Sequence, residues 1–143
     1  MQGSCLCGAV EFRVDGISPK AYRCHCSLCR KQGGTSSNLA IIVEAQNFSW
    51  VTGHERIQSY VRPSGFRSDF CCKCGSPVPN PLRTTSYYWV PVGLLDDAET
   101  VEVGAHLFTG SKASRETIPS DAPHFETVPK LSHLLELLSS RRR

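Results

Sequence analysis

Eight cysteines in a chain of 143 residues are the feature that most constrains this sequence. They occur in three short groups: Cys5-Leu6-Cys7, then Cys24-His25-Cys26-Ser27-Leu28-Cys29, then Cys71-Cys72-Lys73-Cys74. The N-terminal residues do not have the charged and apolar regions of a signal peptide, so we expect a cytoplasmic protein with reduced thiols. Clustered cysteines in a reducing compartment bind metal more often than they form disulfides. The three groups therefore predict a zinc protein.

Length and composition indicate which other classes of protein this chain matches poorly. The chain is long enough for one domain with a hydrophobic core, and its 40% apolar and 20% charged residues are typical of a globular protein. Of the net charge of +3, Arg141, Arg142 and Arg143 supply three positive charges. The rest of the chain is therefore close to neutral, which is a poor match to a nucleic-acid binder. No apolar run approaches about 20 residues, so we also expect no membrane span.

Alternating apolar and polar residues, separated by closely spaced turns, predict a mainly β fold. Pro63-Ser64-Gly65 is typical of a hairpin turn, and residues 27–32 are expected to form a helical turn. The expected strands cover residues 5–14, 20–26, 39–43, 56–62, 66–72, 87–92 and 101–109.

The C-terminal residues follow a different pattern. Leu131, Leu134, Leu135 and Leu138 recur at i, i+3, i+4 and i+7, which predicts a short amphipathic helix. We therefore expect a zinc-binding domain over residues 3–129 and a C-terminal helix with a basic tail over 130–143. An apolar helical stripe usually packs on its own domain, and binding of a partner protein is the alternative.

The first two cysteine groups each contain a pair of cysteines two residues apart. Because such residues point to the same face of a strand, Cys5 is expected beside Cys7 and Cys24 beside Cys26. The same alternation turns His25 to the opposite face.

The third group contains a C-x-x-C turn followed by Gly75. This spacing wraps two thiolates around zinc, and glycine permits the backbone conformation that the turn needs. Cys71 and Cys74 are thus the expected pair, while Cys72 points elsewhere.

A structural zinc takes four protein ligands, whereas a catalytic zinc keeps a position open for a ligand. Spacing does not fix which cysteine groups combine. The most economical division leaves a trio with three protein ligands, which is typical of a catalytic site. The trio could also be closed by Cys72, His25 or a distant histidine, or it could hold no ion. The economical division is Cys5, Cys7, Cys71 and Cys74 for one zinc, and Cys24, Cys26 and Cys29 for another.

At these residues the chain resembles the family of glutathione-dependent formaldehyde-activating enzymes, which includes centromere protein V. A weaker match continues after the cysteines. The chain departs from the family pattern at two places. It has Ala113-Ser114-Arg115 where a Trp is common in the family, and Cys72 is an extra thiol. The matching segments are Gly3-Ser4-Cys5-Leu6-Cys7-Gly8-Ala9-Val10, Cys24-His25-Cys26-Ser27-Leu28-Cys29-Arg30-Lys31, Phe70-Cys71-Cys72-Lys73-Cys74-Gly75-Ser76 and, more weakly, Val92-Gly93-Leu94-Leu95-Asp96-Asp97, His106 and Ser111-Lys112.

The resemblance implies a zinc-bearing, mainly β fold often called a β-tent. It implies a structural zinc on the four-cysteine set and a functional zinc on Cys24, Cys26 and Cys29. The family's named activity joins glutathione to formaldehyde and gives S-hydroxymethylglutathione. The family is classed with the carbon–sulfur lyases, after the reverse reaction.

This activity needs a group that binds the two carboxylates of glutathione. Arg23, Arg30 and Lys31 lie beside the trio in the sequence and are the expected substrate-binding residues, with Arg67 a more distant candidate. We therefore expect a zinc-dependent carbon–sulfur lyase that acts on glutathione or a similar small thiol and an aldehyde. The alternative is a non-catalytic zinc-stabilised interaction module that uses the C-terminal helix and its Arg tail.

Overall fold

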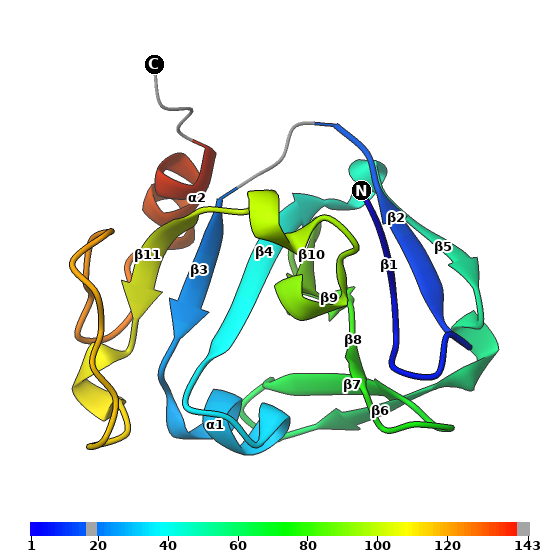
Figure 1. Cartoon of the computed structure of the whole chain (residues 1–143), viewed down its shortest axis with the longest axis horizontal. Helices are drawn as coiled ribbons and strands as arrows, with labels where there is room; N and C mark the ends of the chain where they lie inside the picture. The colour runs from blue at the N-terminus through cyan, green and yellow to red at the C-terminus, as the bar shows by residue number, and fades with distance from the viewer. Residues whose placement is uncertain (17–19, 140–143) are drawn as a thin grey trace. The chain divides into compact units, whose positions relative to one another are not determined.

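The computed structural model describes residues 1–16 and 20–139 (Figure 1). The chain divides into two compact units. Unit 1 comprises Met1–Ile17 and Ile42–Thr100, and unit 2 comprises Ser18–Ile41 and Val101–Arg143. Taken together, the described residues form many more strands than helices, which confirms the predicted mainly β class. The expected domain over residues 3–129 stays a prediction.

One sheet of unit 1 has the strand order β1 (Gln2–Ser4), β2 (Glu11–Val14) and β5 (Phe48–Thr52), all antiparallel. In β2 the apolar Phe12 and Val14 are buried while the charged residues between them are exposed, as their alternation predicts. The Phe12 ring packs against Phe48 and Trp50 of β5, with ring centroids 5.8 and 6.4 Å apart. Burial of these rings stabilises the sheet on one face.

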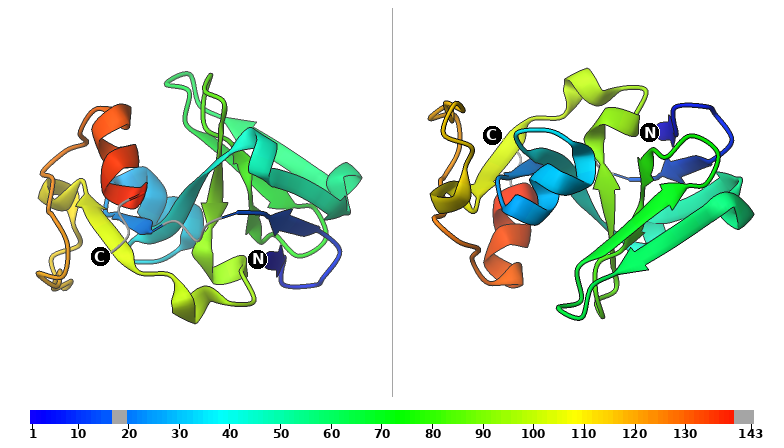
Figure 2. Two further views of the ribbon diagram at one scale, coloured as in Figure 1. Left: turned by 90° about the horizontal axis from the view of Figure 1, so that it is seen from above. Right: turned by 90° about the horizontal axis from the view of Figure 1, so that it is seen from below.

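A second sheet of unit 1 joins β6 (Ile57–Val61), β7 (Arg67–Cys71) and β8 (Pro77–Val78). The predicted hairpin is confirmed, since β6 and β7 pair along their length on both sides of the Pro63-Ser64-Gly65 turn (green in Figure 2). Gly65 has a φ of 89°, which glycine adopts without strain. The other elements of unit 1 are β9 (Asn80–Pro81), which pairs with β10 (Tyr87–Pro91), and the 3-10 turns Ala45–Asn47, His54–Arg56, Val92–Leu94 and Ala98–Thr100.

Unit 2 is centred on β3 (Ala21–Cys24), which runs parallel to β11 (Val103–Leu107) and antiparallel to the start of β4 (Asn38–Glu44). Helix α1 (Ser27–Gly33) follows β3 directly, as the sequence predicts, and ends at Gly34 in the left-handed conformation. The 3-10 turn Thr109–Ser111 follows β11.

Helix α2 (Leu131–Ser139) also belongs to unit 2 and lies beside β11 (α2 red, β11 yellow-green in Figures 1 and 2). Leu134 and Leu138 are buried on its inner face, so the predicted amphipathic helix and its packing on the same chain are confirmed. Gly104 of β11 provides the room, because a Cβ there would lie 3.1 Å from a methyl group of Leu138. Arg141, Arg142 and Arg143 lie outside the described residues. No helix in the described part of the chain is long and apolar enough to cross a membrane.

The predicted strand over residues 5–14 is wrong in its first half. Cys5–Ala9 form the turn between β1 and β2, closed by hydrogen bonds from Gly8 N–H to the Cys5 carbonyl and from Cys5 N–H to the Val10 carbonyl. Gly8, with a φ of 75°, makes this reversal possible. Strands β1, β5, β8 and β9 were not predicted; β8 and β9 have only two residues each and contain proline.

Candidate metal centres and active site

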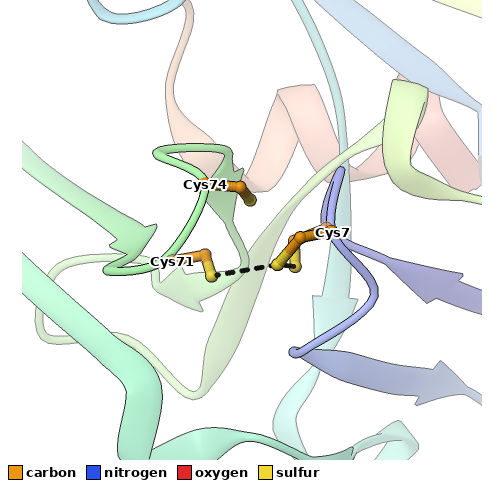
Figure 3. A group of neighbouring side chains, drawn as sticks. Cys7, Cys71 and Cys74 are labelled. Atoms are coloured by element: carbon orange, nitrogen blue, oxygen red, sulfur yellow. Dashed lines mark hydrogen bonds between the residues drawn. The ribbon is translucent and has the colours of Figure 1, made fainter.

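The first cysteine cluster is formed by four residues that come from two turns of unit 1. Its sulfur atoms all lie within 4.8 Å of one another, and the sulfurs of Cys5 and Cys7 are 3.6 Å apart. The sulfurs of Cys7 and Cys71 are 3.9 Å apart, with Cys74 beside them (Figure 3). In a tetrahedral ZnS₄ site with Zn–S bonds of about 2.3 Å, the sulfur atoms lie about 3.8 Å apart. The donor set and its spacing therefore suit a zinc ion. The members of this cluster, called here the four-cysteine cluster, are Cys5, Cys7, Cys71 and Cys74.

Two turns hold this cluster, and Ser76 connects them. Its Oγ accepts a hydrogen bond from the backbone N–H of Leu6, in the first turn, at 2.9 Å. Its carbonyl oxygen accepts from the backbone N–H of Cys71, at the second turn. The prediction that Cys5 and Cys7 converge holds, but the turn brings them together rather than one face of a strand. Ser76 was missed by the sequence reasoning, although it follows directly after the C-x-x-C-G segment.

The thiols of this cluster differ in exposure and acidity. Cys5 and Cys71 are buried, whereas Cys7 is exposed and Cys74 is half-buried. Hydrogen bonds from the side chain and the backbone of Ser76 lower the pKa of Cys74 to about 5. Cys74 is therefore a thiolate at neutral pH, which is the form that binds metal.

The second cluster, called here the trio, comprises Cys24, Cys26 and Cys29 of unit 2. Cys24 ends β3, Cys26 is the N-cap residue of α1, and Cys29 lies in the first turn of that helix. Their sulfur atoms also lie within 4.8 Å of one another. Cys26 leaves the strand before the helix begins, so the trio converges through a strand end and a helix start rather than through strand alternation.

Hydrogen bonds within the trio give its three thiols different pKa values. The thiols of Cys24 and Cys29, together with the backbone N–H of Cys29 at 3.3 Å, lower the pKa of Cys26 to about 2. The hydrogen bond to Cys26 raises the pKa of Cys24 to about 11, and the hydrogen bond to Cys24 raises the pKa of Cys29. One thiolate and two thiols thus stand together at neutral pH, and a bound divalent cation would favour the ionised form of all three.

The proposed ways of closing the trio have no support among the described residues. Cys72 is exposed and belongs to neither cluster. His25, between two trio residues, is buried and packs against His106 on β11, with ring centroids 5.8 Å apart. No histidine, aspartate or glutamate of residues 1–16 and 20–139 joins the three sulfur atoms. The trio therefore offers three ligands, which suits a metal that keeps one position for another ligand.

The basic residues expected to bind substrate occupy different environments. Arg23 donates from Nη1 to Ser37 Oγ at 3.1 Å, and its charge acts on His25 and Asp121. Arg30 follows Cys29 on α1 and is half-buried; its Nε has no hydrogen-bond partner in the described part of the chain. Lys31 is exposed. Their role in binding substrate stays a prediction.

Beside His25, which follows β3, lies a pair of polar side chains that the sequence did not reveal. His106 is buried, and its Nε2 lies 2.8 Å from Oδ1 of Asp121, which is half-exposed. The hydrogen bond to His106 lowers the pKa of Asp121. A separation of 15 residues carries no sequence signal, so this pair emerges only from the fold.

Comparison with known proteins gives the fold and the family. A crystal structure of a Rhodobacter sphaeroides protein superposes with a TM-score of 0.58 at 24% sequence identity, covering 87% of this chain and 100% of that one. It supports the fold alone. A curated protein of Halomonas elongata, named "Putative glutathione-dependent formaldehyde-activating enzyme", is 37% identical over 84 residues. This match covers 53% of the present chain and 52% of the relative, so it spans about half the relative's length.

The sequence profile named "Glutathione-dependent formaldehyde-activating enzyme" matches residues 1–111. This stretch includes both cysteine clusters and most of the strands. Because the match covers well over half of the chain, it confirms the family suggested by the three cysteine segments. The chain belongs to the glutathione-dependent formaldehyde-activating enzyme family.

Proposed function

We propose that the protein is a zinc-dependent carbon–sulfur lyase of the S-hydroxymethylglutathione synthase type, acting on glutathione or a similar small thiol. The observation that carries the proposal is the trio, whose three sulfur atoms lie within 4.8 Å of one another without a fourth ligand from the described residues. Family membership and the name of the Halomonas relative support the same thiol and aldehyde. The reaction requires reduced thiols, such as those of the cytoplasm.

The two clusters have different roles in this proposal. The four-cysteine cluster would hold a structural zinc, because it supplies a complete ligand set and includes the buried Cys5 and Cys71. The trio would hold a functional zinc. Zinc bound there supplies a positive charge that keeps a substrate thiol deprotonated or polarises the aldehyde oxygen.

In the forward reaction the glutathione sulfur forms a bond to the formaldehyde carbon. The carbonyl π electrons move to oxygen, which takes up one proton, so the proton lost by the thiol is regained as a hydroxyl. Cys24, Cys26 and Cys29 fix the place where the sulfur lies, since each is held by β3 or α1. Arg30 and Lys31, on the same helix, and Arg23 would bind the carboxylates of glutathione.

The alternative of a non-catalytic interaction module has less support. It used the C-terminal helix and its Arg tail to bind a partner, and Arg141, Arg142 and Arg143 lie outside the described residues. Leu134 and Leu138 are buried, with α2 packed on β11. The apolar stripe of the C-terminal helix therefore packs within this chain.

Exchange NMR on a mixture of glutathione and formaldehyde tests the proposal, because it measures adduct formation and breakdown at equilibrium. Zinc-loaded wild-type protein is expected to raise the exchange rate above the spontaneous rate. The Cys29→Ser variant loses one trio ligand. Its increase of the exchange rate over the spontaneous rate should be at least about tenfold smaller than that of the wild type. Cys72→Ser is the matched control, since it changes an exposed thiol outside both clusters and should leave the rate unchanged.

Binding of glutathione alone gives a second readout. We expect Arg30→Met to weaken glutathione binding about tenfold while the zinc content is unchanged, because a charge-assisted hydrogen bond to a carboxylate is lost. A zinc-loaded wild-type protein that neither binds glutathione nor changes the exchange rate would contradict the proposal.

A further inference from the structure

A cleft of about 370 Å³ lies in unit 1, and none of its lining residues belongs to either cysteine cluster. Its walls come from β5, the 3-10 turn at His54–Arg56, the β6–β7 hairpin and β10. Six of the lining residues carry rings or charges, and we call this site the aromatic cleft. They are Trp50, His54, Glu55, Arg67, Asp69 and Tyr88.

An ion pair fixes the guanidinium group in the cleft. Arg67 donates from Nε to Oδ1 of Asp69 at 2.8 Å and from Nη2 to Oδ2 at 3.1 Å. Its Nη2 also donates to Ser59 Oγ on the neighbouring strand at 3.3 Å. Asp69 is only 3% exposed, so its carboxylate serves Arg67 and is not available to a ligand. These contacts use Nε and Nη2, and Nη1 donates to no residue in the described part of the chain, so it can donate to a ligand.

Next to this ion pair, aromatic rings pack against one another along the wall of the cleft. Phe48 stacks on Tyr88 with centroids 4.2 Å apart and meets Trp50 edge to face at 4.9 Å. Trp50 in turn stacks on His54 at 5.4 Å. Such mutual packing limits side-chain motion, so the cleft presents fixed aromatic surface to a flat ligand at little entropic cost.

The charges in the cleft narrow the class of ligand. Glu55 and Asp69 give two negative charges and Arg67 gives one positive charge, so an anion is disfavoured. A simple cation could reach the exposed Glu55 carboxylate but not the buried Asp69 carboxylate, and it would also meet the guanidinium group of Arg67. An uncharged ring with hydrogen-bond acceptors and donors on its edge satisfies both Arg67 Nη1 and the exposed Glu55 carboxylate.

We propose that the aromatic cleft binds an uncharged planar heteroaromatic molecule of the nucleobase or nucleoside class. The ring would stack on the wall formed by Trp50, accept a hydrogen bond from Arg67 and donate one to Glu55. A phosphate on the same molecule weakens binding, because the cleft carries net negative charge. The proposal does not depend on the reaction at the trio, since every lining residue belongs to unit 1.

Tryptophan fluorescence of the zinc-loaded protein tests this proposal. The chain has two tryptophans; Trp89 is 8% exposed and outside the cleft, so quenching by a cleft ligand reports Trp50. The probes are adenosine, cytidine, AMP, benzoate and tetramethylammonium, with isothermal titration as a second measurement. We expect saturable binding of at least one nucleoside below about 1 mM, and at least fivefold weaker binding of AMP than of adenosine.

Two variants locate the site. Glu55→Gln, at an exposed position, should weaken nucleoside binding about fivefold, whereas Glu99→Gln, exposed outside the cleft, is the matched control and should have no effect. Arg67→Lys keeps the charge beside Asp69 and should weaken binding about tenfold, with Arg62→Lys as its control. Stronger binding of AMP, benzoate or tetramethylammonium than of both nucleosides, no binding of any probe, or binding that Glu55→Gln leaves unchanged would overturn the proposal.

Discussion

Neighbouring cysteines of the third group differ sharply in their surroundings. Cys71 is completely buried, in contact with Cys5, Val10 and Val78, and its sulfur belongs to the four-cysteine cluster. Cys72, one residue later, is exposed and belongs to neither cluster. The C-x-x-C spacing predicted this difference, because it assigns Cys71 and Cys74 as the ligands of the turn and excludes Cys72, which lies between them.

Serine at each of these two positions should give opposite results. Cys71→Ser removes a buried ligand and should release the structural zinc, lowering the midpoint of thermal unfolding by about 10 °C or more. Cys72→Ser should change neither the zinc content nor the midpoint by a measurable amount. Differential scanning calorimetry and elemental analysis measure both quantities. Equal destabilisation by the two substitutions would contradict the assigned ligand set.

The uneven acidity of the trio predicts how its zinc affinity depends on pH. With the pKa of Cys26 lowered to about 2 and those of Cys24 and Cys29 raised, one of the three sulfurs is ionised at neutral pH in the metal-free protein. Binding of zinc as three thiolates must then release two protons. The affinity should therefore rise about 100-fold per pH unit between roughly pH 6 and 8. Below this range the higher proton concentration competes more strongly with zinc for the sulfurs, so zinc binds more weakly.

Isothermal titration in buffers of different ionisation enthalpy counts the released protons. The measurement starts from protein that already holds one zinc, so that the trio alone is titrated. An affinity that does not change with pH would mean that all three sulfurs are already ionised before zinc binds.

At the scale of elements, the turns rather than the strands bring the ligands together. The β1–β2 turn carries Cys5 and Cys7, and its Ala9 carbonyl lies against Gly53, at the end of β5. Gly53 has a φ of 80°, and a Cβ at this position would overlap the Ala9 carbonyl oxygen. The sequence predicted the hairpin of β6 and β7 from its own local turn. It could not predict this contact, because the two turns are more than 40 residues apart.

Gly53→Ala should therefore disturb the turn that holds the ligands. We expect a loss of about 3 kcal/mol or more of the free energy of unfolding, because the substitution combines backbone strain with a clash against backbone. Gly93→Ala is the matched control, since no atom lies within 4 Å of a Cβ there and its φ is not positive. Urea unfolding of both variants measures the difference. A Gly53→Ala protein as stable as Gly93→Ala would contradict the described contact.

Helix α2 stabilises unit 2 through its buried leucines. Leu138→Ala removes a side chain that is 3% exposed and should cost about 2–4 kcal/mol of the free energy of unfolding. Ser132→Ala, on the exposed face of the same helix, should change it by less than about 0.5 kcal/mol. The same urea titration distinguishes them. Equal stability of the two variants would mean that α2 does not pack on β11.

At the scale of the molecule, each cysteine cluster lies within one unit: the four-cysteine cluster in unit 1 and the trio in unit 2. Spacing alone left open which pairs combine, and the structure brings together the sulfurs of the most economical division. The family follows from residues 1–111. The His106–Asp121 pair and the aromatic cleft could not be predicted, because each joins residues that are distant in the sequence and follow no motif.

In the proposed function the protein holds two zinc ions, and only the one at the trio accepts a thiol. Native mass spectrometry before and after addition of glutathione measures both properties in one experiment. We expect two zinc ions per wild-type chain and one in Cys29→Ser, with glutathione bound by the wild type alone. Two zinc ions retained in Cys29→Ser, or a wild-type protein whose spectrum glutathione leaves unchanged, would contradict the proposed function.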